Sequence, residues 1–231
     1  IPNAFASTIN SIPFQSSQKL ALSLFLKFFS LVLNGKVPSD FSSIWNSSRL
    51  LALVKPNGKL RPIAIGEPLA KIAGRILLKQ QAEKITSFFP PLQFGVQLPG
   101  GPEAIYHTMD FLLEQNPFLA SLRLDITNAF NEVMRKKILE QILIHFPSLY
   151  SYITLLYRTE SELFFTDPSS KEVEILFSKE GCKQGDSLSP FLFALVLQLA
   201  LKHTQISFPD ITVIAQADDS LFIGKEDTLA F

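Results

Sequence analysis

The sequence predicts an α+β fold, in which hairpins of antiparallel strands are combined with long helices. Two apolar runs at 50–55 and 60–65 flank Pro56-Asn57-Gly58-Lys59, and Asn-Gly between such runs is a strong hairpin signal. Helical periodicity follows at 67–89 and stops at Pro90-Pro91. Because hairpins stand between helices, the chain lacks the regular strand-helix alternation of a parallel sheet, and antiparallel, non-sequential strands are expected.

The rest of the chain continues this mixture of elements. A helix is predicted at 101–114, and a short strand at 119–124 runs directly into Asp125. Downstream, the pattern predicts helices at 128–145, 147–157 and 187–203, and strands at 162–166, 172–178, 211–215 and 220–223. The last two strands bracket Asp218-Asp219, which we therefore expect at the tip of a tight hairpin.

Composition excludes disorder and a disulfide-stabilised fold. The 231 residues are 47% hydrophobic, which is enough for one large domain or two closely packed lobes. Cys182 is the single cysteine, so it has no partner within the chain, and we interpret it as a small buried packing residue. The absence of a disulfide framework fits a reducing, intracellular compartment, either nuclear or cytoplasmic.

Two apolar stretches, 16–33 and 187–201, are short for a bilayer crossing and are interrupted by polar residues or proline. We interpret them as buried or amphipathic helices and expect no membrane partner. The chain opens at Ile1 and shows no targeting signal, so we expect it to begin inside a longer protein.

Charge is balanced overall but concentrated locally. Lys and Arg together number 21, as do Asp and Glu, which argues mildly against a protein that grips a polyanion with its whole surface. Between Arg49 and Lys79, however, seven basic residues face the single acid Glu67. This segment is a candidate phosphate-contacting surface, and a solvated helix-and-hairpin surface is the alternative.

Two acidic sites stand at strand ends. Asp125 ends an apolar strand, and Asp218-Asp219 joins two others, so carboxylates are placed where little else is polar. Like charges in such a position are costly unless cations neutralise them, although an exposed turn would also favour Asp. Carboxylates from two strand ends could hold Mg²⁺, and a pair of such ions catalyses phosphoryl transfer. The combination suggests nucleotidyl transfer.

Five segments in order resemble reverse transcriptases. Leu122-Arg-Leu-Asp125-Ile-Thr-Asn-Ala-Phe130 is similar to the first palm motif of that family, Gly181-Cys-Lys-Gln184-Gly185-Asp-Ser-Leu-Ser-Pro190 to the second, and Gln216-Ala-Asp218-Asp219 to the third. Lys55-Pro-Asn-Gly-Lys-Leu-Arg61-Pro-Ile resembles the fingers hairpin, and the block from Phe94-Gly-Val to Pro99-Gly-Gly101 resembles a segment that precedes the palm. The resemblance extends over residues 49–223 and implies the right-hand polymerase fold, with a palm and a fingers subdomain.

The resemblance implies roles for the acidic residues and for one aromatic residue. Asp125 and Asp218 would hold two Mg²⁺ ions, for which Mn²⁺ could substitute, with Asp219 as an accessory third carboxylate. Phe130, five residues after Asp125, would be a steric gate that collides with a ribose 2′-hydroxyl and so selects deoxynucleotides. A core phenylalanine on a helix is the alternative for this residue.

The resemblance also implies contacts with the incoming nucleotide. Gln184 and Gly185 would pack an amide side chain and close backbone against it. Arg61 and Lys55 would meet the triphosphate from the fingers hairpin, where Arg suits bidentate phosphate contact. For these two cations, ordinary surface charge is the alternative.

The implied organisation is an N-terminal helical segment at 1–48, fingers at 49–118 and a palm at 119–231, with the later palm motifs and the thumb beyond the chain. The implied partners are an RNA or DNA template, a DNA primer and dNTPs. One residue departs from the family: Gln216 occupies a position that is usually aromatic and lies against the primer and template.

Two other functions remain open at this stage. A viral RNA-dependent RNA polymerase shares the palm, but it typically has Asp where this chain has Phe130 and Gly where it has Ala217. A degenerate or domesticated palm could instead act as a nucleic-acid-binding scaffold, which the neutral charge and Gln216 favour weakly. Among reverse transcriptases, the spacing is closer to non-LTR retrotransposons and group II introns than to retroviruses.

Overall fold

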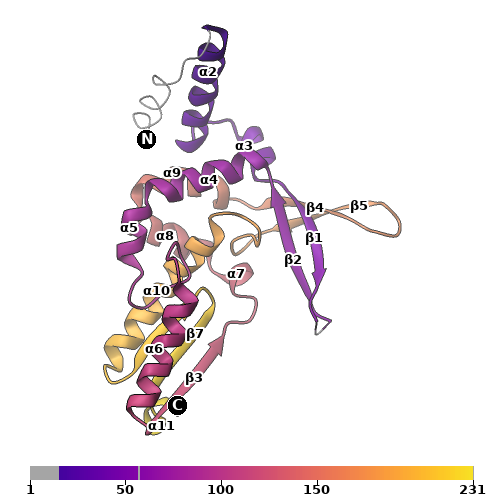
Figure 1. Ribbon diagram of the computed structural model, residues 1–231. Coiled ribbons are helices and arrows are strands. Elements are labelled where there is room, and N and C mark those ends of the chain that lie inside the picture. Colours follow the sequence, from indigo (N-terminus) through magenta and orange to yellow (C-terminus); the bar gives the residue numbers. More distant parts are fainter. Residues whose placement is uncertain (1–15, 57, 231) are drawn as a thin grey trace.

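The computed structural model describes residues 16–56 and 58–230, so most of the predicted segment 50–65 is included but Asn57 is not. Two β-sheets and a set of helices form the molecule (Figure 1). This confirms the predicted α+β class. Of the predicted N-terminal segment, residues 1–15 lie outside the described residues, and the remainder contains α2 (Ser16–Leu33) and α3 (Ser39–Asn46).

The first sheet has the strand order β2-β1-β4-β5. Strands β1 (Ser48–Val54) and β2 (Leu60–Gly66) pair antiparallel, as predicted for a hairpin. Strands β4 (Ser161–Thr166) and β5 (Val173–Ser178) form the second predicted hairpin, and β4 lies parallel to β1. Both hairpins extend to the same side of the molecule in Figure 1.

The second sheet has the order β3-β7-β6 and is antiparallel throughout. Its strands are β3 (Leu119–Asp125), β7 (Asp219–Lys225) and β6 (Thr212–Gln216). Across β3 and β7, Asp125 is the direct partner of Asp219, which is also paired with Gln216 across β6. The register therefore brings both acidic segments of the sequence to one end of one sheet.

Two helices predicted as continuous are each divided in two, so those predictions were wrong in detail. The helix predicted at 67–89 consists of α4 (Pro68–Gln80) and α5 (Ala82–Phe88), because Gln81 leaves helical geometry. This change of direction lets Ile85 and Phe89 both reach the core, where neither is exposed.

The helix predicted at 128–145 is likewise divided, into α7 (Ala129–Glu132) and α8 (Arg135–His145), by two extended residues at 133 and 134. The extended step allows Ala129 and Arg135, at the starts of the two helices, both to be buried. Periodicity alone does not detect such interruptions, because tertiary burial imposes them.

The remaining helices are α6 (Gly101–Gln115), the short 3₁₀ helix η1 (Pro147–Leu149), α9 (Tyr150–Tyr157), α10 (Ser189–Ser207) and α11 (Glu226–Leu229). Helix α10 is the centre of the core, and its first half is buried on nearly every side, as its apolar sequence predicts. Phe191 of α10 meets the rings of Phe89 and Phe146 edge to face. Among the described residues, none of the helices is both long and apolar enough to cross a membrane.

Neither sheet comes from one continuous part of the sequence. The β4–β5 hairpin lies within 119–231 but extends the sheet of β1 and β2, and Ser48 is paired with Leu163. Conversely, α6 lies within 49–118 but packs against β3 and β6 of the second sheet (Figure 1). The linear division at residue 118 therefore does not coincide with the division between the two sheets.

A buried arginine connects the hairpin β4–β5 to the segment before α10. The Arg135 guanidinium donates to the carbonyls of Gly181 and Thr159, both at 3.0 Å, and to Oγ of Ser178 at 2.8 Å. It also lies over the ring of Tyr157, 5.5 Å from its centre. Burial lowers the pKa of Arg135 below its ordinary value, but an arginine stays protonated at neutral pH.

We predict that Arg135→Met lowers the free energy of unfolding by about 2 to 4 kcal/mol, because buried acceptors lose their donors while the side-chain volume is nearly kept. Urea denaturation of wild type and variant measures this difference. Arg158→Met is the matched control, since Arg158 is exposed. Equal losses in the two variants would show that the buried hydrogen bonds of Arg135 contribute nothing particular.

Candidate active site

One cleft contains five of the eight residues that the sequence singled out. Arg61 of β2, Phe130 of α7, Gln184, Gly185 and Asp218 all line a cavity of about 320 Å³. Ile63, Asp186, Ser189 and Pro190 complete its wall. These residues come from four separate parts of the chain, so the fold alone brings them together.

The segment between β5 and α10 is held directly against β2. The N–H of Ala64 donates to the carbonyl of Gln184 at 2.7 Å. Gly185 has a φ of +105°, and a Cβ at this position would lie 2.5 Å from the carbonyl oxygen of Ala64. Only glycine allows both the backbone angle and this approach, so the two walls of the cleft depend on Gly185.

Phe130 lines the cleft, and its ring packs against the ring of Phe193. Its ring centre is 5.0 Å from that of Phe193 in α10, and the two planes are tilted by 32°. Its carbonyl accepts the N–H of Cys182 at 2.7 Å, which ties α7 to the segment before α10. Cys182 itself is buried, as expected for a packing residue, and burial raises the pKa of its thiol to about 12.

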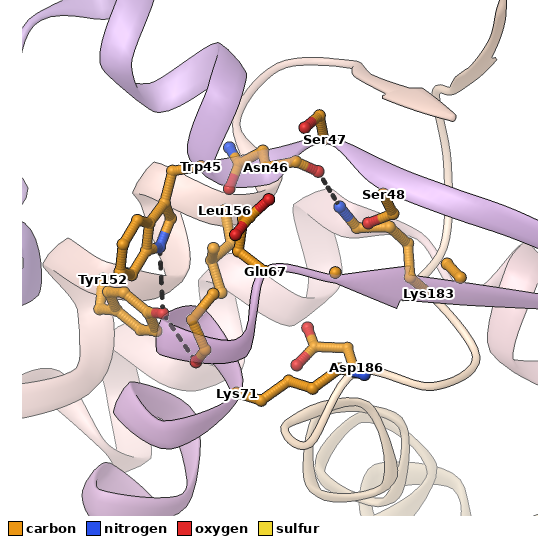
Figure 2. A pocket seen from close by; sticks show the side chains of 13 residues that line it. Trp45, Asn46, Ser47, Ser48, Glu67, Lys71, Tyr152, Leu156, Lys183 and Asp186 are labelled. Atoms are coloured by element: carbon orange, nitrogen blue, oxygen red, sulfur yellow. Dashed lines mark hydrogen bonds between the residues drawn. The ribbon is translucent and has the colours of Figure 1, made fainter. Parts of the chain in front are cut away.

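A second group of polar contacts surrounds a small cavity that shares Asp186 with the cleft (Figure 2). The ammonium group of Lys183 donates to the carbonyl of Asn46 at the end of α3. Trp45 donates to the Tyr152 hydroxyl at 3.3 Å, and that hydroxyl donates to the carbonyl of Ala70 in α4 at 3.3 Å. These contacts surround a cavity of about 30 Å³, room for one water, and connect the N-terminal helices to the cleft.

Burial also lowers the pKa of Lys183, to about 8, although the nearby carboxylate of Asp186 acts in the opposite direction. Asp186 accepts the Tyr157 hydroxyl at 2.6 Å and the N–H of Leu188 at 3.1 Å. Asp186 thus lines both the small cavity and the cleft. Asp186 is not among the residues predicted from the sequence, although its place directly after Gly185 indicates a position in the cleft wall.

Asp125 and Asp219 lie at the same sheet end as Asp218 but outside the wall of the cleft. Direct cross-strand partners project to the same face of a sheet, so the side chains of Asp125 and Asp219 share one face. Asp219 accepts from Arg123 at 3.0 and 3.3 Å. Both members of this pair are well exposed, so it contributes little to stability.

The carboxylates at this end of the sheet can be compared with the ligands that a divalent metal ion requires. In the described part of the chain, no three His, Cys, Asp or Glu side chains gather closely enough to hold an ion alone. Mg²⁺, however, commonly takes only one or two protein carboxylates and completes its shell with water and substrate phosphates. Asp218, which lines the cleft, and Asp125, which ends β3 at the same end of the sheet, are two carboxylates of this kind.

Two residues from the sequence analysis lie elsewhere. Lys55 begins the turn of the β1–β2 hairpin, where its N–H bonds to the carbonyl of Lys59 at 2.8 Å, and it does not line the cleft. Gln216 lines a neighbouring groove of about 340 Å³ with Tyr106 and Met109 of α6. Its buried Oε1 accepts no hydrogen bond from any residue that the structure describes.

Comparison with known proteins agrees with this geometry. Residues 53–229 match the family described as reverse transcriptase (RNA-dependent DNA polymerase). The chain is 32% identical over 193 residues to the retrotransposable element SLACS 132 kDa protein of Trypanosoma brucei gambiense, covering 81% of this chain and 16% of that protein. It is 29% identical over 219 residues to the Pol polyprotein from type-1 retrotransposable element R2 of Popillia japonica, covering 86% and 30%.

Solved structures show the same fold. Apo telomerase from Candida tropicalis, truncated from its C-terminal domain, superposes with a TM-score of 0.59 at 14% identity, over 80% of this chain and 45% of that one. The Sicinivirus 3Dpol RNA-dependent RNA polymerase gives 0.51 at 16% identity, over 87% and 43%. At such identities the likeness concerns the right-hand polymerase fold alone, which the sequence analysis predicted.

The family match decides between the two polymerase classes. The chain spans less than a third of the length of either retrotransposable-element protein. Both proteins nevertheless come from elements of the predicted non-LTR type, and the matched family is not that of the viral RNA polymerases. The chain belongs to the reverse transcriptase family.

Proposed function

We propose that this chain is the fingers and palm of an RNA-directed DNA polymerase encoded by a retrotransposon, which adds dNTPs to a DNA primer on an RNA or DNA template. The observation that carries this proposal is the single cleft that gathers Arg61, Phe130, Gln184, Gly185 and Asp218. Family membership supports the binding of a nucleic-acid template and primer. Telomerase, a structural relative, has been solved with telomeric RNA.

The subdomains follow the two sheets. We assign the sheet of β1, β2, β4 and β5 to the fingers and the sheet of β3, β6 and β7 to the palm. The fingers then consist of the segment 49–118 without α6, together with the β4–β5 hairpin. The palm consists of the segment 119–231 without that hairpin, together with α6. In the segment 1–48, Trp45 and Asn46 contact Tyr152 and Lys183, which both belong to the segment 119–231.

Asp125 and Asp218 are the residues that would hold two Mg²⁺ ions, or Mn²⁺ in their place, with Asp219 as the accessory carboxylate. Reverse transcriptases are generally divalent-metal enzymes. When bound, the ions would activate the primer 3′-hydroxyl and stabilise the leaving pyrophosphate. In the structure, Arg123 neutralises Asp219, which relieves its repulsion with Asp125 opposite.

The other cleft residues would bind and select the nucleotide. Arg61 lies in the fingers wall, where its guanidinium suits two hydrogen bonds to a triphosphate, and Lys55 adds charge at the hairpin turn. Gln184 and Gly185 would pack against the incoming nucleotide. Phe130, which packs against Phe193 of α10, would block a ribose 2′-hydroxyl.

A palm that binds nucleic acid without catalysis is the second candidate. Gln216 favours it, because a residue that is usually aromatic is here an amide with a buried, unpaired oxygen among the described residues. The two candidates differ in whether the carboxylates at the sheet end are needed for more than folding.

We predict that the full-length protein extends a DNA primer on an RNA template with dNTPs and Mg²⁺, and that Asp218→Asn lowers the rate by at least about 100- to 1,000-fold, because a metal ligand acts on the transition state. Asp210→Asn is the control, since Asp210 is an exposed turn residue before β6. A wild type that binds the primed template but never extends it would support the scaffold and contradict the enzyme.

We predict further that Phe130→Ala lowers the preference for dNTP over rNTP by at least about tenfold, because the selection depends on a clash with the sugar. The measurement is the ratio of kcat/KM values for the two nucleotides. Phe191→Ala, in the core of α10, controls for loss of packing. A ratio that changes equally in both variants would make Phe130 an ordinary core residue.

A further inference from the structure

The turn that carries Asp218 has an unusual backbone. Only Ala217 and Asp218 separate the paired ends of β6 and β7, Gln216 and Asp219. Ala217 has a φ of 55°, in the left-handed region that residues with a Cβ rarely adopt. Such a conformation persists only where surrounding contacts fix it, so the turn requires an external support.

The side chain of Gln93 makes three hydrogen bonds, two of them with this turn. Its side-chain Oε1 accepts the N–H of Ala217 at 2.8 Å, and its Nε2 donates to the carbonyl of Ala217 at 3.1 Å. The same Oε1 accepts the N–H of Gly95 at 2.8 Å, which fixes the amide in place. The residue is completely buried, so water does not compete for these bonds.

The backbone around Gln93 is also held to the sheet. The N–H of Ala215 donates to the carbonyl of Leu92 at 2.7 Å, and the N–H of Phe94 donates to the carbonyl of Ala215 at 2.8 Å. Gly95 approaches the turn so closely that a Cβ there would collide with the backbone nitrogen of Ala217. The segment 92–95 therefore forms a fixed support beneath the turn.

From this geometry we infer that Gln93 is a positioning residue for the polymerase reaction: it fixes the Ala217 turn and so aims Asp218 at the nucleotide cleft. The inference rests on the proposed function for its catalytic consequence. Gln93 does not line the cleft, so it acts through the turn and not on the substrate. Asp218 lines the cleft and follows Ala217, the residue that Gln93 bonds, directly in the sequence.

The test compares two buried glutamines in the full-length protein. Gln93→Met keeps the side-chain length and removes all three bonds. Gln198→Met is the matched control: Gln198 is 1% exposed and donates to the carbonyls of Phe88 and Phe89. The Phe89 carbonyl also accepts the backbone N–H of Gln93, so this control disturbs the same segment while leaving the side-chain bonds to Ala217 in place. Both variants lose buried hydrogen bonds, but only the first releases the turn.

We expect Gln93→Met to lower kcat for dNTP incorporation by about 100-fold, as a displacement near 1 Å of a reacting group can do. KM for dNTP should stay within about threefold, because Arg61 and Gln184 are untouched. Amide hydrogen exchange in the segment 213–220 should become faster. Gln198→Met should keep kcat and the exchange rate of that segment near the wild-type values.

A kcat for Gln93→Met as high as that for Gln198→Met would overturn the inference. If Gln93→Met does not fold, Gln93→Asn serves instead, because it keeps a buried amide but is one methylene shorter, so the amide no longer reaches both groups of Ala217. Wild-type kcat in that variant would also overturn the inference. Failure of the proposed function is a separate result, a wild type that incorporates no dNTP. In that case hydrogen exchange still tests the structural part of the inference. An unchanged exchange rate in the segment 213–220 of Gln93→Met would show that Gln93 does not fix the Ala217 turn.

Discussion

The antiparallel register of β3 against β7 is the constraint on which the candidate site depends. It places Asp125 opposite Asp219, and the two-residue turn then places Asp218 beside them at the rim of the cleft. A slip of one residue would turn one strand's side chains to the other face and separate the carboxylates. Buried Ile223 of β7 opposes such a slip, because the slip would move its side chain from its buried position to the other face of the strand.

The cleft needs a second constraint, since its walls come from different sheets. The hydrogen bond from Ala64 to Gln184 and the close approach of Gly185 join the fingers sheet to the segment that precedes α10. Two further hydrogen bonds fix that segment: Arg135 donates to its Gly181 carbonyl, and its Lys183 donates to the carbonyl of Asn46. These buried contacts are polar and directional, so they fix the position of the loop more narrowly than apolar packing does.

Local signals were sufficient for the hairpins, for the apolar helix α10 and for the motif residues that line the cleft. They were insufficient where distant contacts decide. The breaks at Gln81 and Val133 follow from which residues reach the core, and the parallel pairing of β4 with β1 joins segments more than a hundred residues apart. Gln93 was not predicted as a site residue for the same reason, because Ala217, which it holds, lies 124 residues away in the sequence.

We propose that Asp125 and Asp218 together hold the metal ions of a DNA polymerase. The most direct measurement is a crystal structure of the full-length protein with a primed template, a non-hydrolysable dNTP and Mn²⁺, in which anomalous scattering locates the ions. We expect ions about 4 Å apart that contact both carboxylates and the triphosphate. Ions bound elsewhere, or Asp125 and Asp218 more than about 8 Å apart on different surfaces, would contradict it.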